Sequence, residues 1–312
     1  MLDLQASGAI PAASDTPKMR GEPVSISTTD GACLAGLWFL PKRKPKATYV
    51  IHGATGLAQR YYRKFAAWLA QEQGCACLTY DYRDFAASLT GDIRRSKATF
   101  SDWGLRDQAA ALSHAVERSP TGQVRVIGHS LGGLFLNRSP HNAAIESAVA
   151  IGSGDGNFLA VPPFLAPASF SFWFGYGPML VLTHGYLPGA LSGFGMDLPA
   201  GVFWEWRRWC SEPGFSARAT PPAPRRQAGE KPFPITLLAV QDDALIRPDG
   251  VWRLGEERYA DHPVTQKLLE PEAFELRRIG HMGAFTAEGA PIWPVLAAGP
   301  KRAKPATTRK RG

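Results

Sequence analysis

The feature that most constrains the fold is the alternation of short apolar runs with segments of helical periodicity. The first two runs are joined by the turn signal Asp30-Gly31, and the others show little polar alternation. Strands are expected at residues 24–29, 34–40, 47–53, 75–82, 123–128 and 146–154, and helices at 58–73, at 105–116 and from 131 to 137. This order predicts an α/β fold, a mostly parallel sheet covered by helices on both faces.

The alternation stops after residue 157 and resumes about 75 residues later. Residues 158–215 hold 14 of the 33 aromatic residues, and a Pro-rich polar stretch follows at 220–234. A strand at 235–243, a helix at 248–260, a strand at 274–280 and an apolar stretch at 290–297 come next. We therefore expect a flexible segment at 1–22, a core at 23–157 and 231–297, an aromatic-rich cap with a linker at 158–230, and a basic disordered tail at 298–312.

The positive charge of the chain lies mostly in that tail. The net charge is +8, and six of the positive charges fall in the last 12 residues: Lys301, Arg302, Lys304, Arg309, Lys310 and Arg311. The body is nearly neutral, which argues against nucleic acid as a partner. We expect no secretory signal and no membrane span, because no run of 18 apolar residues occurs.

The cysteines and the remaining motifs exclude several other classes of site. Cys33, Cys75, Cys77 and Cys210 show neither a redox nor a zinc spacing, and their use is typical of a reducing cytoplasm. No phosphate loop, dinucleotide fingerprint or metal-ligand cluster is present, so we expect neither a cofactor nor a metal.

The sharpest chemical motif is Gly128-His129-Ser130-Leu131-Gly132, between an expected strand and an expected helix. A serine on so tight a turn takes a strained backbone conformation, and side chains at the two glycine positions would collide with neighbouring backbone. The turn exposes the Ser130 hydroxyl beside backbone N–H groups that favour negative charge. We predict that Ser130 is a nucleophile.

A serine nucleophile needs a base, and in this architecture the order along the chain is serine, acid, histidine. His281 lies between two glycines near the end of the chain, after the expected last strand, and is the predicted base. The other downstream histidines fit less well: His141 follows the nucleophile segment, His184 lies in the cap, and His262 precedes a proline.

The acid is expected at the end of the strand at 235–243. An aspartate there can accept from the histidine and stabilise the imidazolium that forms. Asp243 is preferred because its following residues enter the next helix, whereas Asp242 is expected to cap that turn. Asp249 ranks third.

The oxyanion hole needs two backbone donors. One is expected to be the N–H of Leu131. The other should come from His52-Gly53-Ala54-Thr55-Gly56, with Ala54 preferred and Thr55 next. His52 itself is interpreted as a structural residue that braces this loop.

These residues resemble the α/β-hydrolase superfamily over about 24–297, and within it a bacterial group of predicted α/β hydrolases related to serine-aminopeptidase-like and monoglyceride-lipase-like enzymes. The strings that carry the resemblance are HGATG (52–56), YYRKFA (61–66), LTYDYR (78–83), DWGLRD (102–107), GHSLGG (128–133), GYLPG (185–189), WRRWC (206–210) and IGHMGAF (279–285). The resemblance implies an eight-stranded sheet with a cap and serine-dependent hydrolysis. Ser130, Asp243 and His281 match its triad positions. Asp84 and Ala86 stand where relatives usually have glycines, and Val240 replaces another.

The predicted function is that of a carboxylesterase-type serine hydrolase that acts on a small, apolar ester, thioester or amide. One alternative is an aminopeptidase-like hydrolase, in which Glu205 or Asp197 would bind a substrate ammonium. The other is a non-catalytic scaffold that keeps the fold. The sequence does not indicate the oligomeric state.

Overall fold

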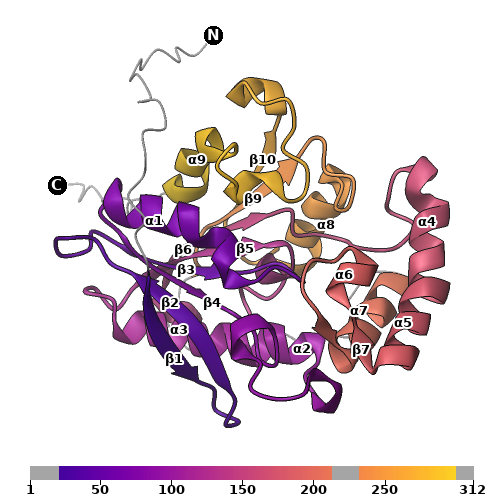
Figure 1. Ribbon diagram of the computed structural model, residues 1–312. Helices are drawn as coiled ribbons and strands as arrows, with labels where there is room; N and C mark the ends of the chain where they lie inside the picture. Colours follow the sequence, from indigo (N-terminus) through magenta and orange to yellow (C-terminus); the bar gives the residue numbers. More distant parts are fainter. Residues whose placement is uncertain (1–20, 213–231, 300–312) are drawn as a thin grey trace.

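The computed structural model describes residues 21–212 and 232–299, and its centre is one eight-stranded sheet (Figure 1). The strand order is β1-β2-β4-β3-β5-β6-β9-β10. β1 and β2 pair antiparallel, as do β2 and β4, and the other pairs are parallel. The strands span Glu22–Ser27, Cys33–Phe39, Ala76–Tyr80, Thr48–His52, Val124–His129, Ile145–Ile151, Ile235–Val240 and Val264–Leu269, in that spatial order. The predicted mostly parallel sheet is confirmed.

Helices cover both faces of the sheet, as predicted. One face packs against α1 (Arg63–Gln71) and α9 (Trp293–Ala298), and the other against α3 (Gln108–Glu117) and α8 (Pro248–Arg258). Neighbouring side chains of β3 point to opposite faces of the sheet. Val50 belongs to the core on the α3 and α8 side, and Ile51 to the core on the α1 and α9 side. Strands buried on both sides explain why their sequences lack polar alternation.

A largely helical insertion separates β6 from β9, and we call its described part, residues 158–212, the cap segment. It lies at one end of the sheet, on the right of Figure 1. A continuous helical stretch runs from Pro163 to His184 and includes α4 and α5. The elements of the cap segment are α4 (Ala166–Ser171), α5 (Gly177–His184), β7 (Tyr186–Leu187), α6 (Gly189–Ser192), β8 (Leu198–Pro199) and α7 (Ala200–Ser211).

By length and composition alone, the stretch Pro163–His184 could also cross a membrane. Its most apolar window has a mean hydropathy of 1.2. Trp173, Leu180 and Val181 are nevertheless buried inside the cap segment. Length and composition of one such helix are weak evidence for a membrane span, and 22% of its most apolar window is buried.

Two expected elements are wrong. The helix expected from residue 131 to 137 is only a 3-10 turn, Ser130–Gly133. A Gly132-Gly133 pair disfavours helix, and the hydroxyl of Tyr259 instead bonds the Gly133 carbonyl and the Leu136 N–H.

The strand expected at 274–280 is a 3-10 turn and a loop, and the last strand is β10. Thr265, Gln266 and Lys267 of β10 are exposed, because this strand lies at the edge of the sheet. Its polar sequence therefore hides it from a search for apolar runs.

Three segments of the expected organisation lie largely or wholly outside the described residues. These are the N-terminal segment, the Pro-rich linker and the basic tail, of which 1–20, 213–231 and 300–312 are not described. Within the described part, β1 already begins at Glu22, and α9 extends to Ala298.

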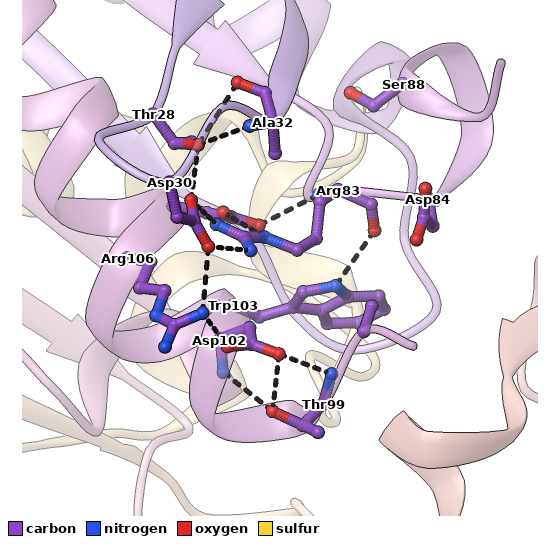
Figure 2. Close-up of polar contacts among 12 residues, drawn as sticks. Thr28, Asp30, Ala32, Arg83, Asp84, Ser88, Thr99, Asp102, Trp103 and Arg106 are labelled. Carbon is purple, nitrogen blue, oxygen red and sulfur yellow. Dashed lines mark hydrogen bonds and ion pairs between the residues drawn. The ribbon is translucent and has the colours of Figure 1, made fainter. Parts of the chain in front are cut away.

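Arg83 ties the first hairpin to the segment after β4 through ion pairs with the partly exposed Asp30 and the buried Asp107 (Figure 2). The Arg83 guanidinium contacts Asp107 at 2.7 Å and Asp30 at 2.6 Å, and the Trp103 indole donates to the Arg83 carbonyl. Burial raises the pKa of Asp107 to about 7, although Arg83 opposes this shift. Two ions withdrawn from water depend on each other, because removing one leaves an uncompensated charge.

The turn that follows Arg83 has positive φ angles at two residues that are not glycine. Asp84 has φ 54° and Ala86 has φ 47°, the left-handed region that glycine favours. The Asp84 carboxylate accepts from the Ser96 hydroxyl at 2.6 Å. Two residues with side chains therefore hold a conformation that glycine favours, which places strain in this turn.

We expect Arg83→Met to lower the free energy of unfolding by about 3–5 kcal/mol, because the buried Asp107 loses its counter-ion and keeps only the backbone N–H of residue 83. The double change Arg83→Met/Asp107→Asn should recover part of that loss. Urea unfolding monitored by circular dichroism measures both. The control is Arg247→Met, which breaks the exposed pair with Asp249 and should change little. Equal stability of the wild type and Arg83→Met would contradict the assignment.

Candidate active site

Ser130 is held in a strained turn at the end of β5. Its φ is 53°, an unusual value for a residue with a side chain. A Cβ on Gly128 would lie 2.5 Å from backbone atoms of Gly132, and a Cβ on Gly132 would overlap the carbonyl oxygen of His52. The two glycines are therefore needed sterically, as the motif indicated.

His281 meets Asp243 directly. Its Nδ1 lies 2.7 Å from Oδ2 of Asp243, whose other oxygen accepts from the N–H groups of Leu245 and Ile246. Asp243 is 3% exposed. A carboxylate fixed in this way can orient the ring and stabilise an imidazolium. His281 and Ser130 line the same cavity.

Asp242 contacts the loop before His281 instead of its ring. It accepts from the N–H groups of Ile279 and Gly280, at 3.1 and 2.8 Å. The expectation that Asp242 caps its own turn is therefore wrong, because Asp243 accepts from the N–H groups of that turn and Asp242 accepts from the histidine loop. Asp249 lies on α8 and pairs with Arg247.

The other downstream histidines lie elsewhere. His184 ends α5 and bonds the Leu180 carbonyl, and His262 bonds the Phe233 carbonyl. His141 precedes the short turn before β6. Within the described residues, His281 is the histidine that lines the cavity with Ser130.

A chain of hydrogen bonds runs beneath the site through Tyr62 and His129. The Ala54 N–H donates to the Tyr62 hydroxyl, which lies 2.9 Å from Nδ1 of His129, and Nε2 of His129 lies 2.9 Å from the His281 carbonyl. Burial lowers the pKa of His129 to about 3, so the ring is neutral at neutral pH. A carbonyl can only accept; Nε2 therefore carries the proton, and Tyr62 donates to Nδ1.

These hydrogen bonds change the predicted choice of oxyanion-hole donors. The Ala54 N–H already donates to Tyr62 at 2.8 Å and is not free for a substrate oxygen, so the preference for Ala54 is wrong in this structure. Thr55 and Leu131 both line the cavity, and neither N–H has an acceptor within the described residues. They are the two available donors, and Thr55 was the second choice.

His52 acts as expected of a structural residue. It is 3% exposed, and its Nδ1 lies 2.8 Å from the Tyr80 hydroxyl. Burial lowers the pKa of His52 to about 3, which keeps it neutral. The ring ties the end of β3 to β4, directly before the loop that carries Thr55.

Sequence reasoning missed three residues around the site: Tyr62, His129 and Gly152. Gly152 follows β6 with φ 58°, and a Cβ there would lie 3.2 Å from Nδ1 of His281. His129 and Tyr62 lie inside the strings GHSLGG and YYRKFA, but only the folded chain brings them together.

The cavity above Ser130 has a volume of about 340 Å³ and lies between the sheet and the cap segment. Its lining is mostly aromatic and aliphatic and includes Phe158, Phe172, Trp173, Phe194 and Trp206. Among the described residues, no Asp, Glu, Lys or Arg lines it. This chemistry suits an uncharged, apolar group.

The two carboxylates that could have gripped an ammonium are engaged elsewhere. Glu205 accepts from the N–H and the hydroxyl of Ser101, both at 2.8 Å, and Asp197 accepts from the Gly189 N–H. Neither lines the cavity. In the part of the chain that the structure describes, no group of three or more His, Cys, Asp or Glu could hold a metal ion.

Comparison with known proteins places this geometry in a family. Residues 49–291 match the model of the alpha/beta hydrolase family. No curated protein sequence matches. Among solved structures, a soluble variant of monoglyceride lipase from Saccharomyces cerevisiae has a TM-score of 0.59 at 13% identity, covering 93% of this chain and 99% of that one.

Two further solved structures show the same fold. An esterase from Pyrococcus furiosus has a TM-score of 0.56 at 16% identity and 89% coverage of both chains. A hydrolase from Pseudomonas aeruginosa has a TM-score of 0.51 at 18% identity, with 87% of this chain and 97% of that one covered. The matched family model spans most of the sequence, and the chain belongs to the alpha/beta hydrolase family.

Proposed function

We propose that this hydrolase is a serine carboxylesterase that cleaves a small ester with an apolar acyl or alkyl group. The observation that carries the proposal is the arrangement of Ser130 and His281 on one apolar cavity, with His281 bonded to the buried Asp243. Esterases and a monoglyceride lipase among the similar structures support the same chemistry.

In the proposed reaction, Nε2 of His281 takes the proton of the Ser130 hydroxyl as its oxygen attacks the ester carbonyl. The N–H groups of Leu131 and Thr55 stabilise the oxyanion. The carbon–oxygen bond to the leaving alcohol breaks, and the alcohol takes the proton from His281. Water then attacks the acyl-enzyme with His281 as base, which releases the acid and restores Ser130.

An ester is favoured over an N-terminal peptide because the lining offers no carboxylate for an ammonium group, within the described residues. Aminopeptidase-like cleavage is the second candidate, and a thioester or other amide is compatible with the same steps. Turnover of p-nitrophenyl esters should exceed that of aminoacyl p-nitroanilides. Faster turnover of the anilides would reverse this order.

A non-catalytic scaffold is the third possibility, and a covalent probe separates it from both enzymes. A fluorophosphonate should label the wild type and fail to label Ser130→Ala. Folded wild-type protein that resists labelling would favour the scaffold.

Cytoplasmic location, independence of cofactors and the lack of nucleic-acid binding stay predictions. Deleting residues 299–312 should remove any retention on DNA without changing the esterase rate.

The two adjacent aspartates provide a matched test of the acid. Asp243→Asn should lower kcat on p-nitrophenyl esters by about 10⁴-fold, because the ring loses the carboxylate that fixes its tautomer. Asp242→Asn should lower kcat far less, since the ring keeps Asp243 and the amide oxygen still accepts from one of the two N–H groups of Ile279 and Gly280. A larger loss for Asp242→Asn than for Asp243→Asn would transfer the role to Asp242.

The strain at the nucleophile predicts a trade between activity and stability. Ser130→Gly should raise the free energy of unfolding by roughly 1 kcal/mol, because glycine adopts positive φ without the Cβ clash. Ser130→Ala keeps the Cβ and should not gain this stability. Both variants should be inactive. Chemical unfolding compares them, and equal stability of the two would show that the turn stores no strain.

A further inference from the structure

The cap segment contains a long stretch with no charged side chain. Residues 156–196 include no Asp, Glu, Lys or Arg, although charged residues make up 20% of the chain. The helical stretch Pro163–His184 lies wholly inside it. Figure 1 places α4 and α5 at the outer edge of the molecule, away from the sheet. A charge-free segment in that position needs an explanation beyond packing.

Large apolar side chains project outward from this helical stretch. We call five of them the exposed stripe: Phe164, Phe170, Phe174, Met179 and Leu182. Phe164 is 79% exposed and Leu182 is 77% exposed. Phe170 and Phe174 are four residues apart, and Met179 and Leu182 are three apart, so each pair lies on one face of the helical stretch. The five side chains together extend from the first turn of the stretch to its last.

The inner face of the same helix is apolar as well. Trp173, Leu180 and Val181 are buried, and Leu165 and Phe172 line the cavity above Ser130. A helix that is apolar all round is normally buried on every side or lies against lipid. Packing inside the cap segment accounts for the inner face only.

Three polar side chains of the helix form hydrogen bonds within the cap segment. The Thr183 hydroxyl donates to the Met179 carbonyl, Nδ1 of His184 bonds the Leu180 carbonyl, and the Ser169 hydroxyl donates to the Phe158 carbonyl. A protein partner would be expected to meet a polar rim with its own hydrogen bonds. The Phe, Met and Leu side chains of the stripe have no hydrogen-bond donors to satisfy, which suits a medium that offers no partners.

Charge favours an anionic lipid surface as that medium. The Arg207 guanidinium lies 5.0 Å from the centre of the Phe174 ring, beside the stripe, and its Nε donates to the Trp173 carbonyl. Basic groups near an apolar surface attract anionic headgroups. An anionic headgroup therefore fits beside Arg207, next to the apolar stripe.

We propose that the exposed stripe docks the cap segment on an anionic lipid surface, with the helix lying along the interface. It lies there and does not span, because spanning would expose Trp173, Leu180 and Val181 and break the contacts of Arg207. Docking itself is independent of the proposed esterase activity. That the lipid phase then supplies an apolar ester to the cavity rests on the proposed function.

Vesicle flotation of the full chain tests the docking. The protein carries Ser130→Ala, so that binding is measured without catalysis. It should float with vesicles of phosphatidylcholine containing 30 mol% phosphatidylglycerol. The double change Phe164→Glu/Leu182→Glu should lower the partition coefficient by at least about tenfold, because each lost apolar contact is worth about one decade of affinity. Neither residue lines the cavity.

The control changes two other partly exposed leucines outside the cap segment. Leu40 is 39% exposed and Leu268 is 40% exposed, and Leu40→Glu/Leu268→Glu should float like the parent. This variant adds the same negative charge as the stripe variant. Equal losses in the two variants would reduce the effect to charge alone and overturn the proposal.

Three other outcomes would overturn the proposal. In the first, the parent protein does not float with the vesicles. Flotation survives the stripe substitutions and is lost only when residues 300–312 are deleted, which assigns binding to the tail. Or the parent is a dimer that the stripe substitutions split, without vesicle binding, which makes a second copy the occupant.

Activity measurements on protein that keeps Ser130 separate the docking proposal from the esterase proposal. The stripe variant should hydrolyse a water-soluble p-nitrophenyl ester at the wild-type rate and lose rate on a long-chain ester held in the same vesicles. Loss of both activities would place the stripe in the fold or the site and contradict docking. Absence of activity in every variant, with flotation intact, would reject the esterase proposal alone.

Discussion

The close approach of backbone at the end of β5 is the constraint on which the site depends. Gly128, Gly132 and the carbonyl of His52 leave no room for a Cβ at either glycine, and Ser130 between them is forced to φ 53°. The same contact brings the loop after β3, which carries Thr55, next to the nucleophile. The strained serine and one wall of the cavity therefore have a single steric origin.

The hydrogen-bond chain through Tyr62 and His129 connects that turn to the loop of His281. Its direction follows from the carbonyl at one end and the Ala54 N–H at the other, with a neutral imidazole between them. A protonated His129 would lack an acceptor for the Tyr62 hydroxyl. Burial of His129, which lowers its pKa, thus keeps three segments in one hydrogen-bonded arrangement.

The sequence predicted the features that local rules determine. Alternating apolar runs indicated the sheet, the spacing around Ser130 indicated the turn, and residue order pointed to His281 and Asp243, which the structure brings together. It misplaced the last strand because an edge strand has no buried pattern. Its preference for Ala54 failed because Tyr62 takes that N–H through a contact visible only in three dimensions.

The aromatic residues of the cap segment also show what composition cannot predict, and they bear on the role of its long helix. Composition alone cannot separate a ring that lines a cavity from one that faces outward, and this helix holds both: Phe172 lines the cavity while Phe164 is exposed. An apolar interior and an apolar exterior on one helix leave no position for a charge. A helix that meets both a substrate cavity and a lipid surface requires that composition, whereas a helix that only covered the cavity would tolerate charges on its outer side.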